Sequence, residues 1–385
     1  MGGAFLARAD DATAASWNPA GLSYLKRPEV SVVGVRNTFQ NTVANAAGTF
    51  IERDRLTGDS PDFLAVTYPI DVASRSGAAQ VSFQRVLSYD AARTIRREDR
   101  TFEISASGGF DVLAAGTGIQ LSRSLRVGAT LNRWFNGYEQ TTDRLGLARG
   151  QVRLLHDFEI SGWNVNGGFI YAPFESLNFG GVVKTGFTGK VTLTRERFDT
   201  SAEGVSTTNY SRSRSVRLDF PGAVGFGVSW RPTTPLTLSV DYTRTGWSEG
   251  RIRNYFTLPI QGQPEPESED FFQSLPFPLL FAPLGPAEQR DTEQARFGIE
   301  YVVIRSRLKV PFRAGYFRDY LHFPDLEGRR PVFKGFTAGV GLVVGPILLD
   351  TAFVFERGKY RDVAGDRVDA TIRRLYVSII YRHGG

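Results

Sequence analysis

Apolar and polar residues alternate along unusually long stretches of this chain, and this alternation constrains its fold more than any other feature. Between residues 216 and 230 the even positions are apolar and the odd positions are polar or small. Successive side chains of a β-strand point to opposite faces, so a period of two predicts a strand with one apolar face. The stretch covers about 15 residues, about three times the usual strand length. Residues 236–243 and 374–382 repeat the pattern.

The same pattern, read along the whole chain, predicts an all-β fold of about 14 strands. We expect them near residues 28–42, 60–70, 77–92, 99–121, 124–138, 150–172, 175–195, 212–231, 235–252, 288–305, 307–321, 331–345, 346–358 and 366–382. Gly108-Gly109 predicts a kink or bulge in the fourth strand, because glycine inside a strand often marks one.

The connections between these strands alternate in length. Short turns, such as Ser122-Arg123 and Gly345-Pro346, take turns with longer polar segments at 90–98, 195–211 and 251–287. An even number of strands joined in this way is typical of an outer-membrane β-barrel. A soluble sandwich is the alternative, but strands this long would give it an unusually tall core. Aromatic residues near the strand ends are expected to form the interface girdles: Trp230, Tyr242, Trp247, Tyr301, Tyr316, Tyr320 and Tyr381.

Composition excludes several function classes. The chain has no Cys, which rules out disulfides, thiolate metal sites and cysteine nucleophiles. Its three His are scattered, so no metal site is expected, and the net charge of +6 is too evenly spread to suggest nucleic-acid binding. The opening MGGAF lacks the basic start and apolar run of a signal peptide. Residues 336–355 have the length of a membrane helix, but Gly345-Pro346 and Asp350 favour two strands joined by a turn.

The segment before the first strand reads ADDATAASWNPAGL over residues 9–22. Its alanines and acids predict a short helix, which Asn18-Pro19 ends because proline disfavours the α conformation in the residue before it. A lumen of 14 strands is too wide for its own side chains to fill. We therefore expect residues 1–27 to lie inside the barrel, although a helix at the rim is the alternative.

Three stretches resemble the FadL/TodX family of outer-membrane transporters for hydrophobic compounds. They are the opening GGAFLARADDATAASWNPAGL, the strand pair at 220–249 that ends in TGWSE, and EQARFGIEYVV followed by VPFRAGYFRD. The resemblance implies a 14-stranded barrel (28–382) whose lumen holds an N-terminal hatch (1–27), with a short tail at 383–385. By this likeness the hatch residues are Asp10, Asp11, Trp17, Asn18, Pro19 and Ala20. The tail departs from the family, whose last strand usually finishes on an aromatic residue.

The family implies uptake of hydrophobic molecules, such as long-chain fatty acids or hydrocarbons, by diffusion past the hatch. No cofactor is needed, and a monomer in contact with outer-membrane lipid and lipopolysaccharide is expected. We interpret the dense apolar run of the longest loop as the outer capture site or lid, with a self-packed cap as the alternative. Its residues are Phe271, Phe272, Leu275, Phe277, Leu279, Leu280 and Phe281.

Strand parity also predicts a set of charged residues that face the lumen. They are Arg217, Asp219, Asp241, Arg296, Glu300 and Arg313, together with Arg126, Lys184, Lys309, Asp319, Asp350 and Glu356. Buried charges must be paired or hydrated, so we expect ion-pair ladders that brace the wall and hold the hatch. Alternatively, some arginines bind a ligand carboxylate, which guanidinium grips with two hydrogen bonds.

The two other function classes are an enzyme and a scaffold or shuttle subunit. An enzyme is not expected, because His156-Asp157 is the only adjacent His–acid pair and the chain has no GxSxG motif. A scaffold or shuttle subunit of a secretion or envelope-assembly system is the main alternative, since PorV-type relatives share the Asn-Pro-Ala hatch. That alternative implies an envelope protein partner.

Overall fold

Over the residues described below, the fold is all β apart from three short helical segments. This computed structural model describes residues 1–45, 47–72, 74–88, 91–96, 100–146, 150–200, 206–249, 290–305, 308–321, 325, 328–361 and 366–384. The helical segments are α1 (Ala14–Trp17) and the 3₁₀ turns η1 (Pro19–Tyr24) and η2 (Trp247–Glu249). The strands are β1 (Glu29–Ala44), β2 (Phe50–Val72), β3 (Arg75–Ser88), β4 (Ala91–Arg96), β5 (Arg100–Gln120), β6 (Leu125–Phe135), β7 (Gly137–Gly146), β8 (Gly150–Phe174), β9 (Leu177–Lys184), β10 (Phe187–Thr200), β11 (Ser206–Phe220), β12 (Ala223–Thr233), β13 (Leu236–Thr245), β14 (Thr292–Arg305), β15 (Leu308–Tyr320), β16 (Val332–Val344), β17 (Ile347–Arg361) and β18 (Arg367–Arg382).

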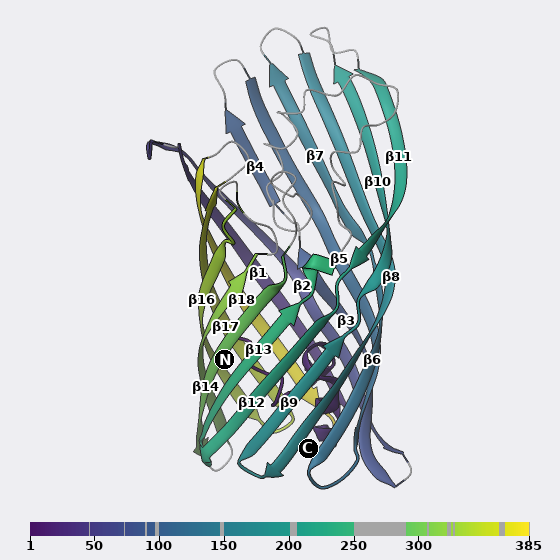
Figure 1. The fold of residues 1–385 in the computed structure, drawn as a ribbon, viewed down its shortest axis with the longest axis vertical. Coiled ribbons are helices and arrows are strands. Elements are labelled where there is room, and N and C mark those ends of the chain that lie inside the picture. The colour runs from purple at the N-terminus through teal and green to yellow at the C-terminus, as the bar shows by residue number, and fades with distance from the viewer. Residues whose placement is uncertain are drawn as a thin grey trace.

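These segments form one closed antiparallel barrel of 14 strands (Figure 1). Four pairs of segments are single strands with an interruption: β3 with β4, β6 with β7, β9 with β10, and β11 with β12. The last strand pairs with the first over their full length, from Glu29 opposite Arg382 to Ala44 opposite Arg367. The predicted strand count and closure are confirmed, and residues 336–355 lie in β16 and β17, joined by the predicted Gly-Pro turn.

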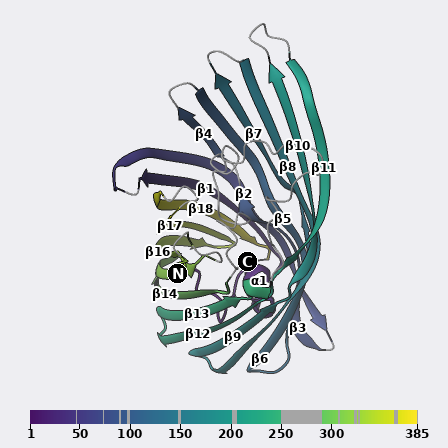
Figure 2. The same cartoon turned by 45° about the horizontal axis from the view of Figure 1, so that its top comes forward.

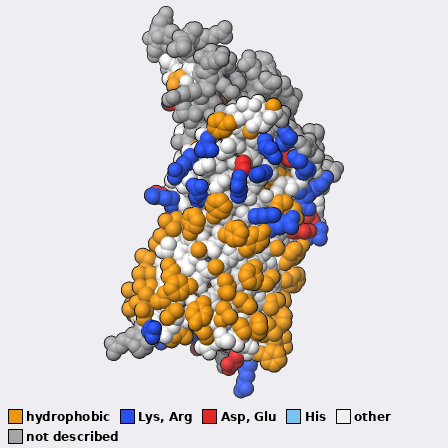
Figure 3. Space-filling model, turned by 90° about the vertical axis from the view of Figure 1, so that its left-hand side faces the viewer, with side chains coloured by type: hydrophobic (Ala, Val, Ile, Leu, Met, Phe, Trp, Pro, Cys, Tyr) orange, Lys and Arg blue, Asp and Glu red, His pale blue; other side chains and the backbone are white. Residues whose placement is uncertain are grey.

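The outward face carries a broad apolar band. Val228, Val240 and Phe297 lie side by side on β12, β13 and β14, and all three are largely exposed. Figure 3 shows the band around the lower barrel, with Lys and Arg gathered above it. Trp230, Tyr301 and Tyr381 are exposed at the short-turn end of their strands, where aromatic residues favour a membrane–water interface. The band therefore has the chemistry of a lipid-facing surface.

Several segments that the sequence pattern predicts as loops are strands instead. β4 occupies 91–96, β10 continues to Thr200, β11 begins at Ser206, and β2 begins at Phe50, ten residues before its predicted start. With β5, β7 and β8, the strands β4, β10 and β11 form a wall above the long-loop end of the barrel (Figure 1). In these extensions polar residues lie opposite each other in β10 and β11, such as Asp199 opposite Thr207 and Thr200 opposite Ser206. Such polar side chains carry no apolar alternation, so the pattern could not reveal these extensions.

Interruptions in the strands reset which side chains face inward. Gly108 has φ +100 where β5 passes from its pairing with β6 to that with β7, at the predicted kink. At Pro221-Gly222, between β11 and β12, the face reverses. Phe220 lies on the inner face of β11, whereas the even-numbered residues of β12, such as Val228, face outward.

The prediction that Arg217 and Asp219 face the lumen is therefore wrong. Arg217 is exposed, and Asp219, whose carboxylate accepts a hydrogen bond from Thr188 Oγ1 at 2.7 Å, lies on the same outer face. The predicted parity assumed one unbroken strand over residues 216–230, and the break at Pro221-Gly222 inverts it for β11.

The N-terminal segment lies inside the ring of strands (Figure 2). It holds the predicted short helix, α1, which ends before Asn18, and η1 follows from Pro19. No helix among the described residues has the length and hydropathy to cross a membrane. The segment lies toward the short-turn end of the barrel, where its contacts with the wall begin.

A charge placed in the middle of the apolar band should destabilise the barrel. Val240 is 53% exposed between Val228 and Phe297, so Val240→Arg would place a cation in hydrocarbon. We expect the free energy of unfolding from lipid bilayers, measured by urea titration, to fall by about 2–4 kcal/mol. Thr38→Arg, at an outward position above the band on β1, should cost at most about 1 kcal/mol. Equal losses for the two variants would contradict the assignment of the band.

Candidate functional site

The Asn18 side chain attaches the N-terminal segment to the barrel wall. Its side chain is fully buried, and its amide nitrogen donates to the carbonyl oxygens of Leu6 at 2.8 Å and of Phe169 on β8 at 2.9 Å. The amide oxygen accepts from the backbone N–H of Ala20 at 3.2 Å and so caps η1. One side chain thus holds the turn together and attaches it to the wall. A side chain with only a donor or only an acceptor could not make this set of bonds.

Glycines of the wall let the segment approach the strands closely. A Cβ at Gly128 of β6 would lie 2.3 Å from the Pro19 carbonyl carbon, and one at Gly168 of β8 would lie 2.1 Å from Asn18 Oδ1. Both distances are far inside van der Waals contact, so only glycine fits at these positions. The segment itself is rich in alanine, and its Ala9, Ala14 and Ala15 pack with Leu22 and Leu25 in one apolar cluster. Residues 1–25 thus fit the wall as a plug.

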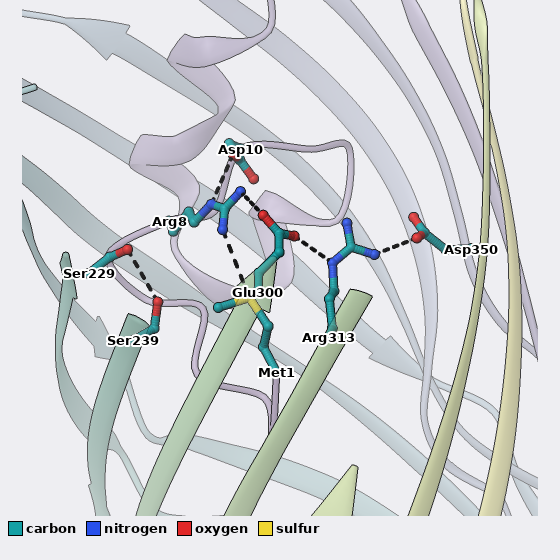
Figure 4. A network of polar contacts seen from close by, with 8 residues as sticks. All are labelled: Met1, Arg8, Asp10, Ser229, Ser239, Glu300, Arg313 and Asp350. Atoms are coloured by element: carbon teal, nitrogen blue, oxygen red, sulfur yellow. Dashed lines mark hydrogen bonds and ion pairs between the residues drawn. The ribbon is translucent and has the colours of Figure 1, made fainter. Parts of the chain in front are cut away.

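A ladder of ion pairs links the plug to the wall (Figure 4). Arg8 Nη2 donates to Glu300 Oε1 at 2.5 Å, and the other oxygen of Glu300 accepts from Arg313 Nε at 2.7 Å. Arg313 also pairs with Asp350 on β17. Each buried charge therefore has an opposite charge beside it, which offsets part of the cost of its desolvation. The residues are far apart in sequence and meet only because β14, β15 and β17 form one inner surface.

Further polar contacts anchor both ends of the plug. Asp241 Oδ2 accepts from the backbone N–H groups of Phe5 at 2.5 Å and Leu6 at 2.8 Å. Arg296 donates to the carbonyl oxygen of Gly2 at 3.1 Å and pairs with Asp319 at 3.3 Å. On the other side, Lys184 Nζ donates to the Ser16 carbonyl oxygen at 3.1 Å. Of the predicted lumen charges, Asp241, Lys184, Arg296 and Glu300 thus contact the plug directly, and Arg313 lies one residue from it.

The remaining predicted hatch residues shape the plug itself. Asp11 Oδ1 accepts from Thr13 N at 2.8 Å just before α1, and Trp17 packs edge-on to Phe5. Pro19 begins η1, and Ala20 is fully buried within it. Asp10 pairs with Arg8 at 3.4 Å, and its side chain is 45% exposed to the lumen. The enclosing barrel still limits its hydration, and this desolvation raises the pKa of Asp10.

Above the plug, three aromatic side chains stack on the inner wall. The Phe187 ring is stacked with Trp134 at 5.2 Å and with Phe220 at 4.7 Å between centroids. A Cβ at Gly162 would lie 2.5 Å from the Phe187 ring, and Gly162 shares a face of β8 with Gly168, which meets the plug. The stack therefore faces the lumen. Its side chains are only partly buried.

Sequence pattern does not reveal this aromatic stack. Trp134 follows a run of ordinary alternation, and Phe187 and Phe220 sit directly beside the breaks at 185–186 and 221–222. Aromatic residues next to a strand interruption are a weak signal, because a surface loop often carries them as well. Pairing of β10 with β8 and β11 brings the three rings together.

The predicted capture residues Phe271, Phe272, Leu275, Phe277, Leu279, Leu280 and Phe281 lie outside the described residues. The two flanks of that segment are joined by Asp291. One carboxylate oxygen accepts from Ser248 N at 3.0 Å and Ser248 Oγ at 2.6 Å, and the other accepts from Arg244 Nη2 at 2.7 Å. These hydrogen bonds, from Ser248 and then Arg244, lower the pKa of Asp291 to about 2.

His156 and Asp157 do not face each other. The two residues are neighbours on β8, so their side chains point to opposite faces of the sheet. His156 is buried on the inner face. Among the described residues, no group of three or more His, Cys, Asp or Glu is arranged to hold a metal ion.

The structure thus defines a closed 14-stranded barrel whose lumen is occupied by its own N-terminal segment. The sequence matches no protein-family model and no curated protein sequence. Solved structures do match, and they show that the chain has the fold of the FadL/TodX transporters.

Three solved structures illustrate the likeness. A FadL homologue of Pseudomonas aeruginosa matches with a TM-score of 0.64 at 12% identity over 98% of this chain and 96% of its own. The CymD monoaromatic hydrocarbon channel matches with a TM-score of 0.60 at 13% identity over 97% and 94%. The Pseudomonas putida toluene transporter TodX matches with a TM-score of 0.57 at 13% identity over 97% and 95%.

Removal of the Asn18 side chain should loosen the plug and leave the barrel folded. Asn18→Ala leaves the carbonyl oxygens of Leu6 and Phe169 without this donor, at a cost of about 1–3 kcal/mol. Hydrogen–deuterium exchange should therefore speed up in residues 1–25 and stay unchanged in the wall. Asn132→Ala, which removes a buried inner-wall amide with no hydrogen bond to the plug, is the matched control. Unchanged exchange in residues 1–25 of Asn18→Ala would contradict the fastening role.

The hydrogen bonds that Asp291 accepts from Ser248 and Arg244 should stabilise the rim only while the Asp291 carboxyl is ionised. Because the folded pKa is about 2 and the ordinary value is 3.8, the stabilisation is fully present above about pH 4 and is lost as the pH falls through 2. We expect wild type to exceed Asp291→Asn in urea midpoint at pH 6, and the difference to shrink at pH 2. If the urea midpoints of wild type and Asp291→Asn differ by the same amount at both pH values, the ionised Asp291 carboxylate does not stabilise the rim.

Proposed function

We propose that this protein is an outer-membrane passive transporter that admits hydrophobic small molecules through a hatch-gated lumen. One observation carries the proposal: a polar-fastened plug lies beneath a lumen-facing aromatic stack. A structural barrel has no need of exposed aromatic rings inside its lumen, whereas a pathway for apolar molecules does. The likeness to FadL-type and toluene-transporting barrels supports the same class of function.

In this proposal the short-turn end of the barrel faces the periplasm and both termini lie on that side. Bacterial outer-membrane barrels have short periplasmic turns and longer extracellular loops. The wall made by β4, β7, β10 and β11 then rises on the outer side of the membrane. A molecule entering from outside reaches the aromatic stack before it reaches the plug.

Passage beyond the stack requires the plug to move. The plug is held by several individual polar contacts, such as those of Asn18, Asp241 and Lys184, and by one small apolar cluster. Each contact of this kind is worth about 1 kcal/mol net, so partial release is within thermal reach while complete ejection is not. The proposed gating is therefore a local shift of residues 1–25, with transport running down the concentration gradient.

Lys184 favours an acidic cargo, such as a long-chain fatty acid, over a neutral hydrocarbon. Its inward-facing side chain contacts the Ser16 carbonyl and has no acidic partner among the described residues. It pairs with Asn166, four residues along β8 from Gly162 and the stack. Four residues along a strand span roughly 13 Å, so Lys184 lies about that far below the rings. An alkyl chain of about ten carbons spans such a distance, with its carboxylate at Lys184 and its tail on the rings.

Substitutions at the two ends of this site should separate the cargo classes. We expect Trp134→Ala and Phe187→Ala to lower the uptake of both a long-chain fatty acid and toluene into proteoliposomes, by about tenfold, because both lose stacking surface. Lys184→Gln should lower fatty-acid uptake alone. Uptake is measured with each labelled compound at equal protein density.

Phe135→Ala is the matched control for this experiment. Phe135 is the neighbour of Trp134 on β6, and its side chain contacts Phe83 on the opposite, outward face of the wall. Its truncation should leave the uptake of both compounds unchanged. If Trp134→Ala and Phe135→Ala behave alike, the stack is not part of the pathway. A stoichiometric protein partner recovered from membranes, without hydrophobic uptake, would favour the scaffold function.

A further inference from the structure

A basic hollow lies on the outer wall, directly above the apolar band. It has a volume of about 700 Å³ and is formed by the outward faces of β16 and β17, residues 325 and 329–331, and the start of β18. Seven of its lining residues are Lys or Arg, and one, Asp325, is acidic. Figure 3 shows this side of the molecule, where the Lys and Arg side chains gather above the apolar surface. Neither the plug nor the lumen takes part in the hollow.

The cations of the hollow are only partly neutralised by the protein. Arg357 Nε donates to Asp369 at 2.7 Å, and Lys359 lies 3.7 Å from the same carboxylate, so one acid serves two bases. Lys334, which is opposite Arg357 in the strand register, has no acidic partner among the described residues. Like charges held this close repel each other unless an anion lies between them. The hollow therefore carries an excess of positive charge.

Arg330 is held in place without using all its donors. Its guanidinium stacks over the Tyr320 ring at 4.5 Å, and Arg318 stacks on the same ring at 4.7 Å. Its Nε and Nη2 are buried and have no hydrogen-bond partner among the described residues. A guanidinium that is held in place by an aromatic ring is suited to bind an anion with several oxygens, such as phosphate.

The floor of the hollow is apolar and continues into the band. Phe336 on β16 is 62% exposed and lies opposite Phe355 on β17. Lys334 and Arg357 form the next outward-facing pair, one step toward the long-loop end. Charged side chains thus stand immediately above aromatic ones at the edge of the lipid-facing surface. A partner that fits must have anionic groups and hydrocarbon chains on the same molecule.

We propose that this hollow binds the phosphate groups of a phosphorylated glycolipid of the outer leaflet, of the lipopolysaccharide type, whose acyl chains lie over Phe336 and Phe355. The inference rests on the orientation proposed above, which puts the long-loop end outside, but not on transport. Charge complementarity carries it: seven cations in one hollow match a lipid with two phosphates better than a zwitterionic lipid. Lipid bound there would fasten β16 and β17 to the outer leaflet.

The test compares lipid retention by a hollow variant and a charge-matched control. The hollow variant is Arg330→Gln/Lys334→Gln/Lys359→Gln, which spares the bidentate Arg357–Asp369 pair. The control is Arg75→Gln/Arg123→Gln/Arg231→Gln, which removes three exposed cations at the short-turn end. Each protein is placed in phosphatidylcholine nanodiscs that contain a small fraction of diphosphoryl lipid A, and bound lipid is counted by native mass spectrometry. Heat-dependent gel migration confirms that each barrel is folded.

Wild type and control should retain diphosphoryl lipid A in preference to monophosphoryl lipid A and phosphatidylethanolamine. The hollow variant should bind it at least about tenfold more weakly. Each Lys or Arg near an anionic lipid strengthens binding by about tenfold or somewhat less, and the variant lacks three of them. Higher salt should weaken binding to wild type. Equal retention by the hollow variant, no preference for the second phosphate, or full displacement by millimolar inorganic phosphate would overturn the proposal. Fatty-acid and toluene uptake by the hollow variant should stay at the wild-type level, so a failed transport proposal would be recognised separately.

Discussion

Backbone hydrogen bonding in a hydrocarbon environment is the constraint on which the rest of this structure depends. A strand that faces lipid has no water to satisfy its N–H and C=O groups, so every strand needs two neighbours. Pairing of β18 with β1 supplies the last pair and removes the free edges. The outward side chains are then free to be apolar, and the short turns and long loops separate to opposite ends. Closure thus accounts for the band and for the order of the connections.

Closure also creates a problem that the N-terminal segment solves. A ring of 14 strands encloses more space than its inward side chains can fill. Residues 1–25 occupy part of that space, and they do so with small apolar residues against wall glycines such as Gly128 and Gly168. The contacts that hold residues 1–25 to the wall are mainly polar. They are made by Asn18, by Asp241 and by the Arg8–Glu300–Arg313 ion pairs. Such contacts keep a defined position, yet each can be exchanged for water, as a movable plug requires.

Two chemically different surfaces lie on the inner and outer faces of the barrel wall. Inside the barrel, the rings of Trp134, Phe187 and Phe220 form an apolar face in an otherwise charged lumen. Outside, the hollow around Lys334 and Arg330 is cationic next to an apolar wall. The first suits a molecule that passes through, and the second suits one that stays.

Much of the architecture could be predicted from the sequence. Alternation gave the strands, their number and the lipid-facing side, and Asn18-Pro19 marked the end of the first helix. These features are local, because side-chain alternation along one strand depends only on that strand's own residues. Prediction failed where local pattern was absent or interrupted. The polar extensions β4, β10 and β11 carry no apolar alternation, and the break at Pro221-Gly222 put Arg217 and Asp219 on the outer face.

The sequence by itself determined the period and count of the strands, and through them a closed barrel with a lipid-facing band and a capped N-terminal segment. Only the tertiary structure decided which charges meet the plug, that three aromatic rings from β6, β10 and β11 stack in the lumen, and that cations from β16, β17 and their flanks share one hollow. The physical reason is that a strand's own residues set which side it buries. Its partners across the barrel depend on register, tilt and breaks, which arise from all the strands together.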